Sequence, residues 1–255
     1  MTTVGDGDAE PRRAQVALVT GAADGIGAAT ARAFAAAGYR LTLVDVSADA
    51  VAATAASVDV DVEVVVADVT DEAATHRAVA AAVERFGQLD VLANVVGGSR
   101  PGKTVMELTL DEWNSLLALN LTSTFLMCKA ALPFLVDRSG VIVNVSSGAG
   151  LRGMKANPGY VAAKAGVAAF TRALAIDHGG SGVRVNAVAP GPVRTPLMRR
   201  NRTPDEIVEM GGLSLSGRIG EPEEIASVIV WLAGDGASYL NGQTLEVDGG
   251  VATAV

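Results

Sequence analysis

Short apolar runs alternate with longer alanine-rich or amphipathic stretches along the whole chain of 255 residues. The short runs are typical of buried parallel strands. We predict strands at 16–19, 41–44, 62–66, 89–94, 141–145, 183–188 and 244–247. We predict helices at 28–37, 48–57, 71–86, 110–135 (broken near Asn120), 158–178 and 222–233, and a loop-rich segment at 194–219 with a short helix after Pro204. This alternation predicts an α/β fold, a single Rossmann-like doubly wound domain with a parallel sheet of about seven strands and helices on both faces.

The domain is expected to cover residues 14–255, because no low-complexity linker or internal repeat divides it. Residues 1–13 are polar and lack the apolar centre of a signal peptide, so we predict a flexible N-terminal tail. No apolar run of membrane-spanning length is recognised, and no membrane partner is expected. The 194–219 segment is the expected substrate loop.

The first predicted strand leads into Thr20-Gly21-Ala22-Ala23-Asp24-Gly25-Ile26-Gly27. Strand, glycine-rich turn and helix in this order form the setting of a dinucleotide-binding fingerprint. Its glycines permit a tight turn and close approach of the backbone to a pyrophosphate, and the helix N-terminus offers unpaired N–H groups. Ordinary loop glycines are the alternative for the bare pattern.

Asp45 ends the second predicted strand, eighteen residues after Gly27. A carboxylate there can accept hydrogen bonds from both hydroxyls of an adenosine ribose. The alternative is that it caps the next helix, although Ser47 could do so instead. Asp45 opposes the additional phosphate of NADP, and Asp24 adds a second acid in the turn, so NAD is the predicted cofactor.

Composition narrows the functional classes. The chain carries 20 basic and 28 acidic residues, a net charge of −8, with no basic stretch that follows a phosphate backbone, so nucleic acid is not an expected partner. The single Cys128 cannot form an internal disulfide and indicates a reducing compartment, hence a cytoplasmic protein. No metal site is predicted.

Tyr160 and Lys164 are four residues apart at the start of a predicted helix, so they share one face. An ammonium about 4 Å from the phenol supplies roughly 4 kcal/mol at an effective dielectric near 20, enough to lower the tyrosine pKa from about 10 to about 7. Lys164 is therefore expected to make Tyr160 a usable acid or base. A surface Tyr–Lys pair is the alternative.

Two further polar residues accompany this pair. Ser147 follows the fifth predicted strand and could bind a substrate carbonyl oxygen, or else form a turn or helix cap. Asn120 lies in an apolar helical stretch, where it could bridge a helix bend directly or through water. Asn94, Ser147 and Pro190-Gly191 all follow predicted strands, so they and the fingerprint are expected at the same edge of the sheet.

Together, TGAADGIG, Asp68-Val69, Asn94, Asn120, Ser147, Tyr160-Val-Ala-Ala-Lys164 and Pro190-Gly191 resemble the short-chain dehydrogenase/reductase family over residues 14 to 250. The resemblance implies hydride transfer between a nicotinamide cofactor and a secondary alcohol or ketone. It implies catalytic roles for Asn120 (water in a proton relay), Ser147 (substrate oxygen), Tyr160 (acid/base) and Lys164 (nicotinamide ribose and tyrosine pKa).

The resemblance also implies a cofactor site. Its predicted members are Gly21, Asp24, Gly25, Ile26, Gly27, Asp45, Asp68, Val69, Asn94, Gly97, Tyr160, Lys164, Pro190, Gly191, Val193 and Thr195. Asn94 is expected to stabilise the central strands. One departure is visible after the fourth strand, where Asn94-Val95-Val96-Gly97 replaces the Asn-Asn-Ala-Gly usual in the family.

Two other functions stay open from the residues alone. One is an NADPH-linked reductase of 3-oxoacyl thioesters, which Asp45 opposes. The other is a nucleotide-sensing protein that kept the fold and lost turnover, which the four catalytic residue types oppose.

The three loops on the expected ligand side carry basic residues and no acids. Arg100, Lys103, Arg152, Lys155, Arg194, Arg199, Arg200 and Arg202 form this basic rim. One interpretation is a small-molecule substrate, or its carrier, with a carboxylate or phosphate held by Arg152, Arg199, Arg200 and Arg202. The alternative is that the rim balances the cofactor pyrophosphate or is merely solvated.

The predicted helix from Tyr160 to Ile176 is apolar nearly all round, as is the Leu116–Leu132 stretch. More than one face of each should therefore be buried. The family resemblance implies a homotetramer with these helices at one contact.

Overall fold

All seven described strands belong to one parallel sheet. A computed structural model describes residues 14–251, so the predicted tail at 1–13 lies outside the described residues. The strand order is β3-β2-β1-β4-β5-β6-β7. The chain adds strands in one direction from β1 to β3 and in the opposite direction from β4 onward, so the order changes between β1 and β4. The strands are β1 Val16–Thr20, β2 Arg40–Asp45, β3 Val62–Val66, β4 Val91–Asn94, β5 Val141–Val145, β6 Arg184–Pro190 and β7 Thr244–Val247. This is the doubly wound, Rossmann-like sheet that the sequence predicts.

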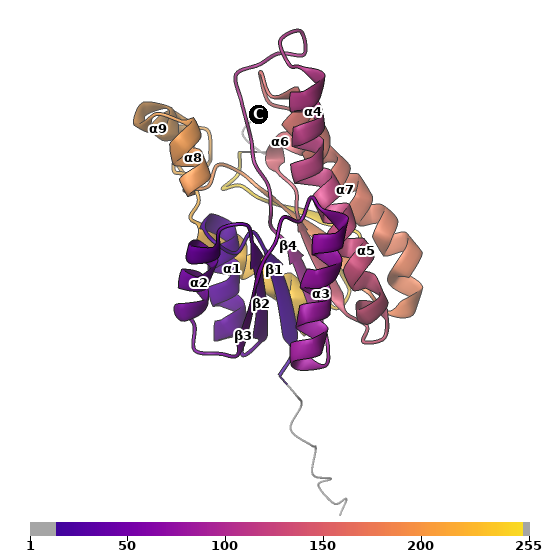
Figure 1. Cartoon of the computed structure of the whole chain (residues 1–255). Helices are drawn as coiled ribbons and strands as arrows, with labels where there is room; N and C mark the ends of the chain where they lie inside the picture. The colour runs from indigo at the N-terminus through magenta and orange to yellow at the C-terminus, as the bar shows by residue number, and fades with distance from the viewer. Residues whose placement is uncertain (1–13, 252–255) are drawn as a thin grey trace, which may run out of the picture.

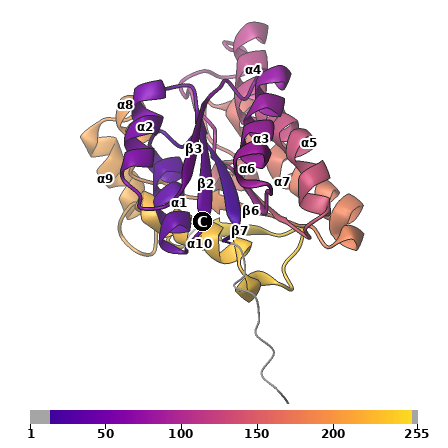
Figure 2. The same cartoon turned by 60° about the horizontal axis from the view of Figure 1, so that its bottom comes forward.

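Helices cover both faces of the sheet (Figures 1 and 2). One face carries α1 Gly25–Ala36, α2 Ala48–Ala56 and α10 Pro222–Ala233. The other carries α3 Glu72–Phe86, α5 Ser123–Val136 and α7 Pro158–His178, with α4 Leu110–Leu117 leading into α5. The short helices α6 Gly148–Arg152, α8 Pro196–Asn201 and α9 Pro204–Gly212 belong to connections at the carboxyl ends of the strands.

Each face of the sheet has its own apolar core. Phe34, Leu41 and Ile229 belong to the core beneath α1 and α10, and Leu92 and Met127 belong to the core beneath α3 and α5. The central strands β1, β4 and β5 are buried along their whole length, which accounts for their continuous runs of mainly apolar residues. The edge strands β3 and β7 are only partly buried, and each contains a glutamate. The low aromatic content is thus compatible with two closely packed aliphatic cores.

The ends of several helices follow from local sequence signals. The Asp71 side chain accepts a hydrogen bond from Ala73 N at the start of α3, and Gly87 ends that helix in the left-handed conformation. Thr109 and Glu112 form a capping box at the start of α4. These devices satisfy backbone groups that a helix end leaves unpaired. They also explain why most predicted boundaries agree with the structure to within a few residues.

The start of one helix and the omission of two short helices need correction. Helix α1 begins at Gly25 rather than at Ala28, because the glycine turn is itself the first helical turn. Helices α6 and α8 are absent from the prediction, since six or fewer residues with glycine or arginine give little periodic signal. The predicted break near Asn120 is confirmed, because residues Ala118–Thr122 form a π-helical turn between α4 and α5.

The expectation that no stretch could span a membrane is wrong as a statement about length and composition. The continuous helical region Leu110–Val136 passes that test, with a mean hydropathy of 1.4. Half of its most apolar window is buried inside the protein, where it packs against α3 and α7. Its apolar character is therefore accounted for in part by the core that it covers.

Candidate active site

The fingerprint turn brings the backbone of two glycines into direct contact. A Cβ atom on Gly27 would lie 1.8 Å from the Gly21 carbonyl oxygen, so no side chain fits there, and Gly21 itself has a φ of +68°. The turn leads into α1, whose N-cap residue Asp24 makes no side-chain capping hydrogen bond and whose first turn has no acid. The N–H groups at this helix start therefore face the cleft as donors suited to a phosphate.

Asp45 lies at the end of β2, beside this turn. Its carboxylate accepts hydrogen bonds from Ala23 N at 3.1 Å and from Ser47 N at 3.0 Å. Neither Asp45 nor Ser47 caps α2 with its side chain, so the capping alternative fails for both residues. The acid instead links the two βα turns that border the nucleotide half of the cleft.

Farther along the same edge, Asp68 and Val69 follow β3 and also line the cleft. The Asp68 carboxylate binds Thr70 through both its N–H and its hydroxyl, at 2.9 and 2.7 Å. This fixes the loop after β3 in a defined position beside Asp45. The nucleotide half of the cleft is thus built chiefly from backbone and short side chains.

Asn94 does not reach the cleft. Its amide donates to Asn144 Oδ1 at 2.9 Å and contacts Cys128 Sγ at 3.3 Å, which joins β4 to β5 inside the protein. The structure thus places Asn94 between central strands, away from the cofactor site in which it was grouped. Burial and the apolar surroundings raise the pKa of the Cys128 thiol to about 12, so this sulfur stays protonated.

Asn120 lies in the π-helical turn and is fully buried. Its side chain donates to Gly98 O at 2.8 Å and accepts from Gly98 N at 3.0 Å, while also donating to Leu116 O. Asn120 does not line the cleft, and it holds in place the loop that carries Gly97, which does. The π-helical turn leaves Leu116 O available to this side chain instead of to the regular helical ladder.

The two valines that depart from the family pattern lie on this loop. Both their N–H groups donate to Thr20 Oγ1, Val95 at 3.1 Å and Val96 at 3.4 Å. Val95 packs on the core beneath α1 and Val96 on the core beneath α5, and both line the cleft. The loop is therefore fixed by a backbone contact that does not depend on a second asparagine.

Ser147, Tyr160 and Lys164 meet beside the ends of β5 and β6. A hydrogen bond joins Tyr160 to Ser147, and the Ser147 oxygen also accepts from Ala149 N at 3.2 Å as the N-cap of α6. Lys164 is only 2% exposed and its ammonium donates to Val145 O at 2.7 Å. Serine, tyrosine and lysine therefore lie together in one desolvated region of the cleft.

The electrostatics of this group differ from the prediction. Burial raises the pKa of Tyr160, and the hydrogen bond with Ser147 acts in the opposite direction. Lys164 is not among the causes of the Tyr160 shift; burial lowers its own pKa to about 8, and its ammonium donates to Val145 O. In this structure the expected direct lowering of the Tyr160 pKa by Lys164 is thus absent.

The cleft has a volume of about 810 Å³ and runs from the fingerprint turn to the helices α8 and α9. This is within the usual range for a small-molecule or cofactor site. Its lining includes, of the predicted residues, Gly21, Asp24, Gly25, Ile26, Gly27, Asp45, Asp68, Val69, Gly97, Ser147, Arg152, Tyr160, Lys164, Pro190, Gly191, Val193, Thr195, Arg200 and Arg202. Asn94, Asn120 and Arg199 are not part of it.

Sequence reasoning missed the apolar wall at the far end of the cleft. This wall consists of Met154, Leu197, Met198, Met210 and Leu213. Three methionines in loop segments near the expected substrate side were the available signal, since methionine adapts to irregular ligand surfaces. This end can accommodate an apolar body of moderate size.

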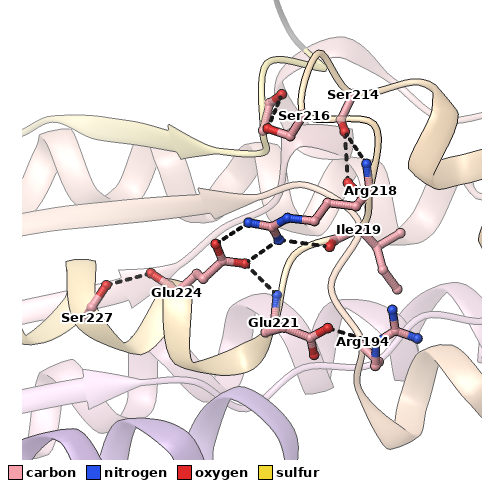
Figure 3. A network of polar contacts seen from close by, with 9 residues as sticks. Arg194, Ser214, Ser216, Arg218, Ile219, Glu221, Glu224 and Ser227 are labelled. Carbon is pink, nitrogen blue, oxygen red and sulfur yellow. Dashed lines mark hydrogen bonds and ion pairs between the residues drawn. The ribbon is translucent and has the colours of Figure 1, made fainter.

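Ion pairs fasten both ends of the 194–219 segment to the start of α10 (Figure 3). Arg194 Nε donates to Glu221 at 2.8 Å, and Arg218 forms two hydrogen bonds with Glu224 at 2.7 and 2.8 Å. Glu224 also accepts from Glu221 N as part of a capping box. The two ends of this segment are thus fixed, and α8 and α9 lie between them in the chain, where Met198 and Met210 line the cleft.

Several basic residues of the rim form ion pairs in the structure, so fewer of them are available to a substrate than the sequence suggested. Arg152 pairs with Glu246 and Asp248, Arg194 with Glu221, Lys103 with Glu112, and Arg202 with Glu206. The acids lie outside the three loops, so loop composition could not reveal them. Among the cations that line the cleft, Arg200 is exposed and has no ion pair within the part of the chain that the structure describes.

The geometry can support acid/base chemistry at an oxygen beside Tyr160 and Ser147, in the same cleft that the fingerprint turn and Asp45 line. A family model described as enoyl-(acyl carrier protein) reductase matches residues 21–252. The chain belongs to the short-chain dehydrogenase/reductase family. The motif order and the parallel sheet thus have one common explanation, and the protein is an oxidoreductase of this type.

Individual relatives agree with this assignment. The chain is 40% identical over 238 residues to meso-2,3-butanediol dehydrogenase of Serratia marcescens, covering 92% of this chain and 94% of that protein. It is 42% identical over 239 residues to cis-4-hydroxycyclohexanecarboxylate dehydrogenase of Sinomonas cyclohexanicum, covering 92% and 96%. The crystal structure of levodione reductase superposes with a TM-score of 0.90 at 36% identity, covering 94% and 98%.

Proposed function

We propose that this enzyme is an NAD-dependent dehydrogenase of secondary alcohols, with Tyr160 as the acid/base. The observation that carries the proposal is the single cleft in which the fingerprint turn and Asp45 lie at one end and Ser147, Tyr160 and Lys164 lie beside the ends of β5 and β6. A nucleotide bound along the turn would extend toward Tyr160. The cofactor supplies hydride transfer when bound.

The residues present fit a nicotinamide dinucleotide. The turn closes on its own backbone, because a Cβ on Gly27 would lie 1.8 Å from the Gly21 carbonyl oxygen. Gly21, Gly25 and Gly27 all line the cleft, and glycines there let the backbone approach a pyrophosphate. Asp45 has its carboxylate at the position that would receive ribose hydroxyls, and its present partners are two backbone N–H groups rather than a cation. An uncompensated carboxylate disfavours a ribose phosphate, which supports NAD over NADP.

The protein groups divide the work at the substrate oxygen. Ser147 would hold the alcohol oxygen, and Tyr160 would accept the alcohol proton as the carbon is oxidised. Lys164 would hold the nicotinamide ribose, and its charge would then favour the ionised phenol once a ligand draws the ammonium from Val145 O. Asn120 would act by fixing the loop at Gly98 or by holding a water in the proton relay.

The far end of the cleft supports a substrate class. Its methionine and leucine wall fits an aliphatic or alicyclic body, and Arg200 offers one exposed cation at its border. One relative is a dehydrogenase of a hydroxycyclohexanecarboxylate, an alicyclic alcohol with a carboxylate. We therefore favour a small alcohol that carries an anionic group. Arg200 would contact this group, and Arg202 would contact it while still paired with Glu206.

The proposal extends to the oligomeric state and the cellular location of the enzyme. Phe125 and Phe134 on α5 are exposed, 44% and 38%, and Ile176 on α7 is 81% exposed, which supports burial of these helices in a homotetramer. The free, buried Cys128 supports a cytoplasmic location. Neither nucleic acid nor a membrane is a proposed partner.

The test is a cofactor and substrate panel. The purified enzyme is incubated with NAD or NADP and with meso-2,3-butanediol, cyclohexanol and 4-hydroxycyclohexanecarboxylate, and reduced nicotinamide is followed by absorbance. We expect turnover with NAD and highest efficiency with the carboxylate. A preference for NADPH and 3-oxoacyl thioesters would replace this proposal with the reductase alternative, and NAD binding without any turnover would favour a sensor.

A further inference from the structure

Arg152 is the last residue of α6, the short helix for which Ser147 is the N-cap. Its guanidinium binds Glu246 through Nη1 and Asp248 through Nη2, the latter at 3.2 Å. The Asp248 side chain is only 6% exposed, and the arginine side chain is 26% exposed. Two carboxylates therefore pair with this guanidinium in a partly buried environment, where solvent screens an ion pair less than at the surface.

Helix α6 needs such support from elsewhere in the fold. It has only five residues, Gly148–Arg152, two of which are glycine, and Gly153 follows it. A single turn of this composition is not stable by itself, because helix nucleation is unfavourable and glycine adds a further entropic cost. Gly150 packs on the backbone of α7, where a Cβ would lie 2.7 Å from Ala165 N. Arg152 fixes the opposite end of the same turn to β7.

The same ion-pair cluster also contacts the turn after β6. A Cβ on Gly191 would lie 2.6 Å from the Asp248 Cβ, and a Cβ on Gly148 would lie 2.4 Å from Arg152 Nη2. Gly191 therefore packs on the acid that Arg152 binds, and Gly148 packs on the guanidinium itself. The cluster lies between the Ser147 turn and the Pro190–Gly191 turn, which line the cleft on adjacent strands.

We propose that Arg152 is a positioning residue for alcohol oxidation and not a substrate ligand: by binding Glu246 and Asp248, it sets the Ser147 turn relative to the Pro190–Gly191 turn. The inference rests on the proposed alcohol oxidation. It replaces the interpretation of Arg152 as a contact for an anionic substrate, because its charge is already matched by two carboxylates. Loss of the guanidinium would release the Ser147 turn and remove the cation that Glu246 and Asp248 bind beside it.

The principal test is Arg152→Met in the full chain, with Arg77→Met as the matched control. Arg77 is an exposed arginine on α3, outside the residues that line the cleft. Each variant is assayed with NAD and with one neutral and one carboxylate-bearing alcohol, and its thermal midpoint is measured. We expect Arg152→Met to lower kcat by about ten- to a hundredfold for both alcohols, because small misplacements of reacting groups have effects of this size. Arg77→Met should match the wild type.

A pH profile separates positioning from a purely structural role. The hydrogen bond with Ser147 favours the ionised form of Tyr160, so a displaced Ser147 should raise the apparent pKa of the acidic limb of kcat in Arg152→Met. Arg152→Lys keeps one cation with fewer donors and should recover part of kcat. Glu246→Gln weakens the cluster from the other side and should lower kcat about threefold with the arginine intact.

Three outcomes would overturn the inference. If Arg152→Met raises KM for the carboxylate alcohol alone and leaves kcat for the neutral one unchanged, Arg152 is a substrate ligand. If Arg152→Met and Glu246→Gln both retain wild-type kcat, the cluster has no positioning role. If Arg152→Met does not fold while Glu246→Gln keeps full kcat and an unchanged pH profile, the role is structural only. An inactive wild type would refute the proposed function instead, which keeps the two failures distinct.

Discussion

The nucleotide half and the substrate half of the cleft are built by different means. The nucleotide half, from the fingerprint turn to Asp68, presents backbone N–H groups and short side chains held by contacts within and between neighbouring βα turns. The substrate half is formed by side chains from α6, α7, α8 and α9. Ion pairs join Arg152 of α6 to Glu246 and Asp248, segments far apart in the sequence. The nucleotide half could therefore be predicted from a short motif, because its residues are held by nearby βα turns. The substrate half could not be predicted from loop composition, because the partners of its charged residues lie far away in the chain.

The sharpest separation of the two halves is expected from Tyr160→Phe. The variant keeps the ring and removes the ionisable oxygen, so kcat should fall by about 10²- to 10⁴-fold, the usual weight of a general acid/base. The NAD dissociation constant, measured by fluorescence titration, should change little because the nucleotide half is untouched. Normal turnover by this variant would mean that another group transfers the proton.

The cofactor preference tests the nucleotide half alone. A carboxylate about 4 Å from a phosphate charge costs roughly 4 kcal/mol at an effective dielectric of 20, on the order of a thousandfold in efficiency before salt screening. The ratio of kcat/KM for NAD to that for NADP should therefore be large. Asp45→Ala should narrow it while the alcohol KM stays the same. Comparable efficiency with both cofactors in the wild type would contradict the assignment of Asp45.

Burial of the Lys164 ammonium lowers the stability of the folded protein. Its pKa falls from 10.5 to about 8 on burial, so between pH 8 and 10.5 the unfolded chain binds the proton and the folded chain does not. Stability therefore rises with pH through this window, and the lysine costs up to about 3 kcal/mol below pH 8.

Urea unfolding checks this linkage. Relative to Lys164→Met, which has no titrating group, the wild type should gain stability between pH 8 and 10.5 without NAD. The variant should also be more stable than the wild type at pH 7, although inactive. A difference between the two proteins that does not vary with pH would show that the ammonium is not desolvated.

The smallest expected effect concerns the substrate half. Arg200→Met should raise KM for a carboxylate-bearing alcohol about fivefold, because an exposed ion pair contributes about 1 kcal/mol at most. KM for a neutral alcohol and for NAD should be unchanged. Arg199→Met removes the same charge from the same helix outside the cleft and serves as the matched control. Equal effects of both variants on both alcohols would show that the arginines of the basic rim are solvated and do not contact the substrate.

Much of the fold and of the catalytic group was predictable from short-range signals. Strand runs, capping residues and the fingerprint act through neighbours in the chain, and the four-residue spacing of Tyr160 and Lys164 fixes their common helix face whatever the rest of the protein does. Even the interruption at Asn120 was visible, because a polar residue with low helix propensity lies within an apolar helical stretch. These features depend on covalent geometry and local hydrogen bonds.

The tertiary structure alone decided which charges are free and where the catalytic groups obtain their partners. Arg152 was a plausible substrate ligand until the fold brought β7, almost a hundred residues later in the chain, against α6. Lys164 was expected to lower the Tyr160 pKa, whereas burial raises the pKa of Tyr160 and the lysine ammonium donates to Val145 O. Burial and ion pairing depend on segments distant in sequence, and desolvation depends on all the atoms around a group. The sequence therefore determined which chemistry-bearing residues are present, and folding determined which of them remain available to a ligand.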